Sequence, residues 1–454
     1  MLTPYSRRDL LKLTSCGFGY AALAGMCTEA SADYANPLSP KAPHFTPKAK
    51  RVIFLCMRGG PSHVDTFDYK PQLAKDDGKK SNSGSRTYLK SPWKFPKRGE
   101  SGLPISDLFP NLSKHADDLC LLNGMYADIP NHPQSYIQMH TGDFRFVRPS
   151  VGAWTLYGLG TENQDLPGFV TITPEPRVGG AQNYGSAFLP AVYQGTRIGQ
   201  LGRSLSNVEV KDIVNNRFSS DIQRDQVDLI QAMNRDLLKE QQVNTELEGV
   251  IESYELAFRM QSALPQLMDL STETEATQKQ YGIGQGNTDN FGRQCLLARK
   301  FAEAGVRYIE LCHANWDQHG GLKARLTANC TAIDKPIAGL LADLKARDML
   351  DDTLIVWGGE FGRTPHAKRA DGRDHNATGF SMGMAGGGVK GGQRYGATDP
   401  HGVAAVENKT HFHDLHATML YLLGLDHKKL TYRYAGRDFR LTDVYGRVLD
   451  DVIA

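Results

Sequence analysis

The sequence predicts an α/β fold built around a large, mostly parallel sheet, and two observations support this prediction. Several continuous apolar runs lack the alternation of half-exposed strands, which is typical of strands buried on both faces. Between the runs at 306–313 and 353–362 lies a segment with apolar residues at helical spacing, from Leu326 to Leu344. A strand, a helix and a strand in this order favour a right-handed crossover, which makes the two strands parallel.

The other elements follow from the same patterns. Further predicted strands lie at 51–57, 118–124 and 168–174. The first of them ends at a Gly-Gly-Pro sequence at 59–61, which breaks regular structure. From about 221 to 268 the chain is polar with apolar residues at helical spacing, which predicts a pair of antiparallel helices inserted into the main domain.

The N-terminus has the pattern of an export signal. Arg7 and Arg8 precede an apolar stretch at 13–26 and the sequence Ala-Ser-Ala at 30–32. Such a stretch is too short for a membrane span, which needs about 20 apolar residues, and paired arginines are typical of the twin-arginine route. We therefore expect cleavage, and a periplasmic or secreted protein. The expected organisation is a signal peptide at 1–32, a linker at 33–50 and a single domain at 51–454.

Charge and cysteine content narrow the range of functions. The chain has 52 Lys and Arg residues against 50 Asp and Glu residues, a balance that does not indicate nucleic acid or an acidic membrane as a partner. No second apolar segment reaches the length of a membrane span. Cys56, Cys120 and Cys312 fall in apolar runs, where a small buried hydrophobic side chain is the expected role. The oligomeric state stays open.

Metal-binding side chains gather just after two of the predicted strands. Asp317 and His319 follow one strand, Glu360 ends the other, and His375 lies in the next loop. Because the carboxyl ends of parallel strands meet at one edge of a sheet, these residues are expected to converge. Imidazole and carboxylate groups suit Zn, Fe, Mn and similar divalent ions. The sequence therefore predicts that these four residues share a metal site.

Neighbouring polar residues have simpler interpretations. His313 at the end of a strand is expected to be a core histidine, and Asp374 a turn residue after Gly372. His413 is a further candidate metal ligand, although an imidazole beside a helix start, here at Asp414, is often a supporting group.

Five motifs resemble one known family. They are GGPSHVDTFD at 59–68, WDQHGG at 316–321, GEFGRTP at 359–365, GRDH at 372–375 and AGGGVKGG at 385–392. Together with the twin-arginine pattern they resemble the family called domain of unknown function 1501, over nearly all of the mature chain. That family is similar to the alkaline phosphatase and sulfatase superfamily, which implies a three-layer sandwich with a metal site at the strand ends. The implied activity is hydrolysis of phosphate or sulfate esters with one or two divalent ions, such as Zn, Ca, Mn or Fe.

The resemblance also implies roles for single residues. The metal ligands that it implies are His63 or Asp65 after the first strand, Asp317, His319, Glu360 and His375. Glu360 stands where the superfamily usually has Asp, and Phe361 follows it where His is frequent. Thr141 and Gly142 resemble the Thr-Gly pair after the superfamily's nucleophile, and counting back from them places the nucleophile position at His132.

His132 therefore stands in place of a hydroxyl or thiol nucleophile. An imidazole at this position can bind metal or act as a general base toward water. Ser135 is the nearest hydroxyl, but no obvious base is adjacent to it in sequence, so we expect it to be the less favoured nucleophile. We expect Arg58, Arg363 or Arg373 to neutralise an anionic group, because the planar guanidinium suits phosphate and sulfate oxygens.

Two functions are consistent with these patterns. The first is an exported, metal-dependent hydrolase of phosphate or sulfate esters, which acts on a small anionic ester or a sulfated polysaccharide. The second is a non-catalytic protein that keeps the fold and binds anionic polysaccharide or a partner protein. The clustered ligands favour the first function, and the missing nucleophile favours the second.

Export is directly testable. The sequence at 30–32 predicts cleavage after Ala32, so the mature chain begins at Asp33. N-terminal sequencing of the exported protein should therefore start at Asp33. An exported protein that still begins at Met1 contradicts the prediction.

Overall fold

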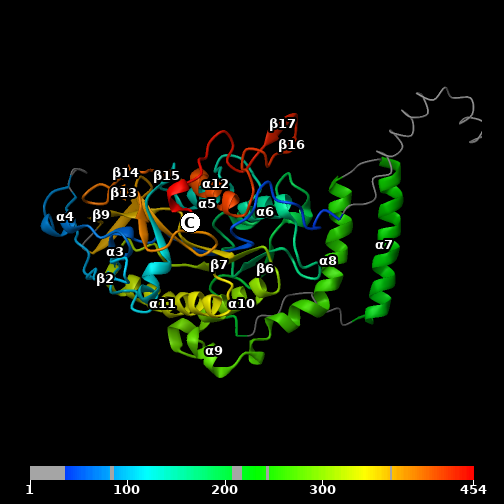
Figure 1. The fold of residues 1–454 in the computed structure, drawn as a ribbon, viewed down its shortest axis with the longest axis horizontal. Helices are drawn as coiled ribbons and strands as arrows, with labels where there is room; N and C mark the ends of the chain where they lie inside the picture. The colour runs from blue at the N-terminus through cyan, green and yellow to red at the C-terminus, as the bar shows by residue number, and fades with distance from the viewer. Residues whose placement is uncertain (1–35, 82–85, 207–216, 242–244, 369–370) are drawn as a thin grey trace, which may run out of the picture.

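A nine-stranded sheet forms the centre of the molecule (Figure 1). The strands lie in the order β12-β4-β11-β8-β1-β7-β5-β6, with β15 paired to β4. They are β1 (Arg51–Met57), β4 (Leu119–Tyr126), β5 (Phe169–Ile172), β6 (Thr196–Ile198), β7 (Tyr308–His313), β8 (Thr353–Gly358), β11 (Phe380–Ala385), β12 (Gln393–Tyr395) and β15 (Thr410–His411). This computed structural model describes residues 36–81, 86–206, 217–241, 245–368 and 371–454. The predicted export signal at 1–32 lies outside the described residues.

The sheet is mostly parallel, as the apolar runs predict. Only β11 is antiparallel to its neighbours, β4 and β8, among the paired strands described for this sheet. Every residue of β1 and of β8 is buried, because helices cover both faces of the sheet. The predicted α/β fold with a large, mostly parallel sheet is therefore confirmed.

Two layers of helices cover the sheet (Figure 1). One face carries α5 (His132–Thr141), α6 (Val151–Leu159) and α12 (Phe412–Leu422), and the other carries α10 (Asp289–Glu303) and α11 (Leu322–Ala346). Adjacent side chains of β1 face the two layers, since Cys56 contacts Tyr136 of α5 whereas Leu55 lies with Ile337 of α11. The amphipathic helix predicted between two parallel strands corresponds to α11.

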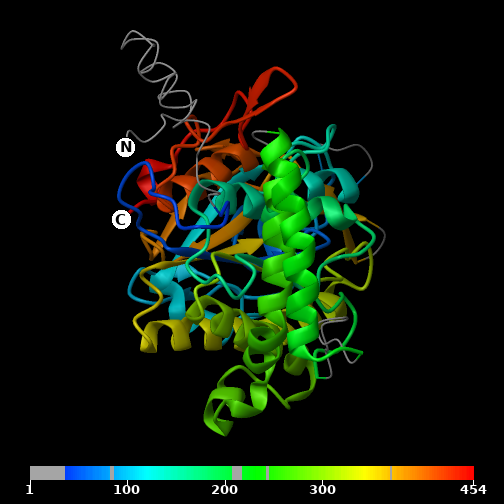
Figure 2. The same cartoon turned by 90° about the vertical axis from the view of Figure 1, so that its right-hand side faces the viewer.

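A pair of long helices stands at one end of the molecule. α7 (Ser220–Gln241) and α8 (Thr245–Met268) lie side by side (Figure 2), and an ion pair of 2.9 Å joins Arg224 to Glu255. The two helices match the helical pair predicted between 221 and 268. Within the described residues, no helix combines the length and the hydropathy that a membrane span needs.

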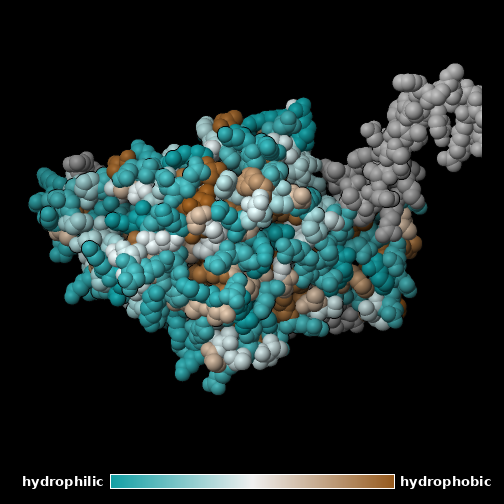
Figure 3. Space-filling view, viewed as in Figure 1, coloured by the Kyte–Doolittle hydropathy of each residue, from teal (hydrophilic) through white to brown (hydrophobic). Residues whose placement is uncertain are grey.

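The segment at 36–50, expected to be part of a linker, runs along the main body. Leu38 is buried, and the backbone N–H groups of Lys48 and Ala49 donate to the carbonyl of Leu422 at the end of α12. The face drawn in Figure 3 is mostly hydrophilic, with apolar residues in small patches. All five cysteines of the described residues are buried and free.

Candidate metal centre

The loops after β1 and β7 meet at the carboxyl edge of the sheet. Gly59 follows β1 with a φ of 117°, a conformation that side chains rarely adopt. A Cβ atom at this position would lie 2.9 Å from the backbone nitrogen of Asp317, in the loop after β7. Gly59 therefore allows the two loops to pack directly on each other.

A hairpin after β8 closes over the same edge. Its strands, β9 (Gly362–Lys368) and β10 (Gly372–Asn376), are antiparallel. A Cβ atom at Gly372 would lie 1.9 Å from the carbonyl oxygen of His319, so the hairpin packs without a gap on the loop after β7. This packing brings His375 of β10 beside His319.

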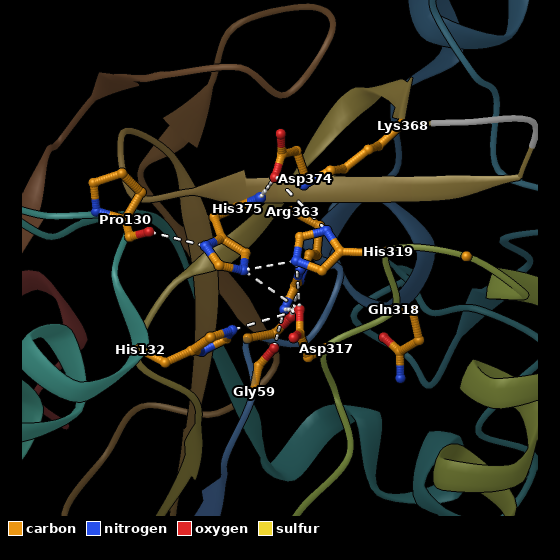
Figure 4. A network of polar contacts seen from close by, with 12 residues as sticks. Gly59, Pro130, His132, Asp317, Gln318, His319, Arg363, Lys368, Asp374 and His375 are labelled. Atoms are coloured by element: carbon orange, nitrogen blue, oxygen red, sulfur yellow. Dashed lines mark hydrogen bonds and ion pairs between the residues drawn. The ribbon is translucent and has the colours of Figure 1, made fainter. Parts of the chain in front are cut away.

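Three imidazole rings converge on one carboxylate oxygen (Figure 4). The Nε2 atoms of His132, His319 and His375 lie 3.4, 3.0 and 3.4 Å from Oδ1 of Asp317. The Nε2 atoms of His319 and His375 are 3.0 Å apart. The four side chains are between 20 and 36% exposed, so the group opens to solvent. We call these four residues the histidine cluster.

Contacts on the far side of two rings fix which nitrogen carries the proton. Nδ1 of His375 lies 2.9 Å from the carbonyl oxygen of Pro130, and a carbonyl only accepts, so Nδ1 is the donor. Nδ1 of His132 lies 2.6 Å from Oε1 of Glu360, and an ionised carboxylate likewise only accepts. In the neutral form of each ring, Nε2 then presents its lone pair.

His319 lacks such a hydrogen bond on Nδ1 among the described residues. Its Nδ1 lies 3.7 Å from Oδ1 of Asp374, a carboxylate that also pairs with Lys368 at 2.9 Å and with Arg86 at 3.0 Å. All three rings direct Nε2 toward Asp317, and those of His132 and His375 are oriented by a hydrogen bond from Nδ1. Imidazoles that bind metal are commonly oriented by an acceptor on the opposite nitrogen.

The electrostatics of the histidine cluster favour a cation. Burial alone would raise the pKa of Asp317, but hydrogen bonds from His132 and His375 in their protonated forms and the charge of Arg363 lower this pKa well below its usual range. For His132, burial lowers the pKa, whereas the bonds with Asp317 and Glu360 more than reverse this effect and raise the pKa overall. A carboxylate that stays ionised and attracts a proton to a neighbouring imidazole also attracts a metal cation.

Arg363 and Glu360 support the cluster from its buried side. Nη2 of Arg363 lies 2.7 Å from Oδ1 of Asp317, and the guanidinium also donates to carbonyl oxygens in the loop after β1. Both carboxylate oxygens of Glu360 accept from the backbone N–H of Gly59 at 3.0 Å. Because Glu360 is fully buried behind His132, it orients this ring and does not face the centre of the cluster.

The residues present fit a divalent ion. One ligand atom from each of His132, Asp317 and His375 lies within 4.8 Å of the other two, so these three residues can hold one ion at the usual distance of about 2.0–2.2 Å. Nε2 of His319 lies 3.0 Å from both Oδ1 of Asp317 and Nε2 of His375. Nε2 of His132 is a buried atom without a hydrogen-bond partner among the described residues. Three imidazoles and a carboxylate suit Zn²⁺ and similar ions better than Ca²⁺, which prefers six or more oxygen ligands.

Two predicted site residues pair with each other outside the cluster. Arg373 and Asp65 form an ion pair with N–O distances of 2.6 and 3.0 Å, and both side chains are fully buried. The same guanidinium donates to the carbonyl oxygens of Thr364 and Leu89. Arg373 therefore offers no exposed donor to an anion, and Asp65 is engaged by Arg373.

Arg58 and Ser135 also have partners of their own. The guanidinium of Arg58 pairs with Glu175 at 2.7 Å and is 25% exposed. Ser135 is fully buried, and its hydroxyl donates to the backbone carbonyl of Glu360 at 2.7 Å. The hydroxyl of Ser135 thus anchors α5 to the end of β8 and is shielded from solvent.

His63 and His413, both predicted ligands, are not brought into the cluster. Nε2 of His63 contacts the carbonyl oxygen of Gly402 at 2.9 Å. Nε2 of His413 contacts the carbonyl oxygen of Gly142 at 2.7 Å, and its ring stacks on Tyr445. Each of these rings therefore donates to a backbone carbonyl elsewhere in the fold.

His413 lines a cleft of about 640 Å³ between α5, α12 and the chain after residue 438. The walls of this α5–α12 cleft carry aromatic and arginine side chains, among them Phe146, Trp154, Phe439, Tyr445, Arg145 and Arg148. Asp128 also lines it and lies in the same loop as Pro130, whose carbonyl contacts His375. The cleft and the histidine cluster therefore share one loop.

Sequence reasoning missed the groups that orient the rings. Pro130 acts through its backbone carbonyl, which no residue pattern predicts. Asp374, expected to be a turn residue, lies in β10 and faces His319. The available signal was the acidic residue directly before His375 in the GRDH motif.

The fold and the centre together define the class. This is an α/β protein with a group of imidazole and carboxylate side chains at the carboxyl edge of a mostly parallel sheet. The chain belongs to the family described as protein of unknown function (DUF1501), whose family model matches residues 49–453. The predicted family is thereby confirmed. No curated protein matches the chain.

Several solved structures have similar architecture but little sequence in common with this chain. The PsFucS1 sulfatase from Pseudoalteromonas sp. is 13% identical, with 83% of this chain and 68% of that chain covered and a TM-score of 0.36. The lipoteichoic acid synthase LtaP from Listeria monocytogenes is 9% identical, with 89% and 78% covered and a TM-score of 0.40. An alkaline phosphatase from the Antarctic bacterium TAB5 is 11% identical, with 84% and 99% covered and a TM-score of 0.35. Because these scores are low, what the centre can do follows from its own geometry.

Metal binding at the histidine cluster predicts a stability change. Wild-type protein treated with a chelator in its folded state should gain about 2.7 kcal/mol of stability when free Zn²⁺ is restored to 100 times its dissociation constant, because the ion binds only the folded chain. His375→Ala should gain much less, since it removes one of the converging rings. The measurement is the melting temperature with and without Zn²⁺.

His401→Ala, which removes a partly exposed histidine paired with Asp76, is the matched control and should respond as the wild type does. Equal gains in all three proteins contradict the assignment.

The pairing of Arg373 with Asp65 predicts a structural role. Arg373→Met leaves a fully buried carboxylate without its partner, which should cost about 3–5 kcal/mol in the free energy of unfolding. Arg433→Met, which removes an arginine from an exposed pair with Asp438, should cost less than about 1 kcal/mol. Urea unfolding of the two variants measures the difference. Similar losses of unfolding free energy in the two variants would contradict the structural role of the buried pair.

Proposed function

We propose that this protein is an exported, metal-dependent hydrolase of phosphate or sulfate esters. One observation carries the proposal: three imidazole Nε2 atoms lie within 3.4 Å of a single oxygen of Asp317, in a group that is open to solvent. Such a group attracts a divalent ion and leaves room for a water molecule and an ester beside it. The export signal predicted at 1–32 supports a periplasmic or secreted location.

Each part of the site has a distinct role in this proposal. The four residues of the histidine cluster would hold the ion. A bound divalent ion would supply Lewis-acid chemistry, which polarises an ester oxygen and lowers the pKa of a water molecule. Glu360 keeps Nδ1 of His132 protonated and its ring in place, and Arg363 compensates the charge of Asp317.

Arg58 is the proposed contact for the anionic group of the substrate. Of the three arginines predicted for this role, Arg363 and Arg373 are fully buried, whereas the side chain of Arg58 is 25% exposed. Arg58 follows β1 directly and precedes Gly59, which packs on the loop of Asp317. Its guanidinium is suited to two oxygens of a phosphate or sulfate group.

The alternative function, binding without catalysis, has its own support in the α5–α12 cleft. Aromatic side chains and Arg145 and Arg148 line this cleft, and Phe146 and Tyr445 are 60 and 62% exposed. Exposed rings and guanidinium groups together suit an anionic polysaccharide. In this alternative, the protein retains such a ligand and the ion contributes to binding alone.

Hydrolysis by water, without a protein nucleophile, predicts different turnover for two variants. His132→Ala should lose about tenfold to a hundredfold in the turnover of an aryl phosphate or aryl sulfate, because it removes a ring that faces Asp317. Ser135→Ala should keep most of the turnover, because the Ser135 hydroxyl is buried and donates to a backbone carbonyl. The assay uses protein reconstituted with Zn²⁺ or Mn²⁺.

Three results would change this conclusion. Loss of all activity in Ser135→Ala, or a covalent phosphoryl or sulfuryl group trapped on Ser135, would overturn the water mechanism. Absence of turnover with every divalent ion, combined with retention on an immobilised sulfated polysaccharide, would support the binding protein instead.

A further inference from the structure

A second group of metal-binding side chains lies buried beneath α5. Cys56 of β1 and Cys312 of β7 are direct neighbours in the parallel register, and Glu310 lies two residues before Cys312 on the same face. His140 reaches this face from α5. All four residues are at most 2% exposed. We call this group the buried cluster.

The side chains of the buried cluster are in mutual contact. Nε2 of His140 lies 3.2 Å from Oε1 of Glu310. The hydroxyl of Tyr136 lies 3.1 Å from Sγ of Cys56 and 3.5 Å from Sγ of Cys312. One ligand atom from each of Cys56, His140 and Glu310 lies within 4.8 Å of the other two. Sulfur, imidazole nitrogen and carboxylate oxygen are the ligand types of Zn²⁺ sites.

The hydrogen bonds of His140 direct its second nitrogen at Glu310. Nδ1 contacts the backbone carbonyl of Tyr136 at 2.7 Å and is therefore the donor. In the neutral ring Nε2 then presents a lone pair to Oε1 of Glu310, and two acceptors at this distance repel one another unless a cation, either a proton on Nε2 or a metal ion, lies between them. Oε2 of Glu310 is also buried and has no hydrogen-bond partner among the described residues. Burial of such a carboxylate without compensation is costly.

We propose that Cys56, His140 and Glu310 bind a structural divalent ion of the Zn²⁺ type. The thiolate of Cys56 and the carboxylate of Glu310 carry two negative charges and the imidazole none, so these three ligands balance a divalent ion. Such balance is what a buried charge requires. On binding, the Cys56 thiol releases its proton to solvent and forms a metal–sulfur bond. In the structure the Cys56 thiol donates to the hydroxyl of Tyr136, and once the thiol has lost its proton this hydroxyl would donate to the thiolate.

An ion at this place would join three elements of the fold. The ligands come from β1, β7 and α5, and α5 begins at His132 of the histidine cluster. The ion would therefore hold the helix that positions His132. Because every ligand is buried, the ion would exchange only when the chain opens, and a chelator acting on folded protein would leave it in place. This inference does not depend on the proposed hydrolysis.

Thiolate ligation gives the buried cluster its own spectroscopic test. Protein produced with Co²⁺ as the supplied divalent metal should show sulfur-to-cobalt charge-transfer absorption in the near ultraviolet, because a thiolate is among the ligands. The histidine cluster has only nitrogen and oxygen ligands and cannot give this band. Cys56→Ser should lose the band and bind one metal ion fewer per chain.

Two variants serve as controls. Cys120→Ser makes the same substitution at another buried cysteine of the same sheet, in β4, and should keep the band. Asp317→Asn disrupts the histidine cluster and should also keep it. The band then separates the two metal sites, whatever the hydrolase activity of the variants.

Results from the wild type and from one variant can each refute the proposal. Folded, Co²⁺-supplied wild type without the band would overturn it, as would a band that persists in Cys56→Ser. A native disulfide between Cys56 and Cys312, detected by mass spectrometry under non-reducing conditions, would also overturn it. If Cys56→Ser fails to fold, Cys56→Ala, which places an apolar group in the buried strand, carries the same expectation.

Discussion

The contact between Arg363 and Asp317 holds the carboxyl edge of the sheet together. Arg363 belongs to the hairpin after β8, donates to the carbonyl oxygens of Gly59 and Gly60 after β1, and reaches Asp317 after β7. A fully buried guanidinium needs acceptors, which Nε and Nη2 of Arg363 have here, and its planar fork fixes where these acceptors lie. The position of Oδ1 of Asp317, and with it the point that three rings face, therefore depends on an arginine that never meets solvent.

Helix α5 connects the histidine cluster with the interior of the sheet. Its first residue, His132, contacts the side chain of Glu360, and one turn later Ser135 donates to the backbone carbonyl of the same residue. Two turns after His132, His140 meets Glu310 in the middle of the sheet. The helix is thus tied at its start to β8 and near its end to β7, so the ring of His132 has little freedom to move away from Asp317.

The sequence was sufficient to predict the sheet, because buried strands are apolar runs. It was also sufficient to predict that Asp317, His319 and His375 lie together, because all three follow strand ends. It could not separate Asp65 from Asp317, since both follow a strand. Asp65 pairs with Arg373, 308 positions further along the chain, and only the folded structure brings that partner to it. The carbonyl of Pro130 is equally invisible in a residue pattern. Glu310 did indicate a buried polar partner in the sequence, since a carboxylate inside an apolar strand requires one.

A single short hydrogen bond joins His132 and Glu360. His132 stands where the resemblance places the nucleophile, and Glu360 stands where it places an Asp ligand. Their side chains are 2.6 Å apart. Glu is one methylene longer than Asp, so the carboxylate of Glu360 extends from the end of β8 to the amide of Gly59 and to Nδ1 of His132. A buried carboxylate behind an imidazole is the usual support of a metal-binding histidine. The two residues are therefore coupled, because the longer acid orients the ring of His132.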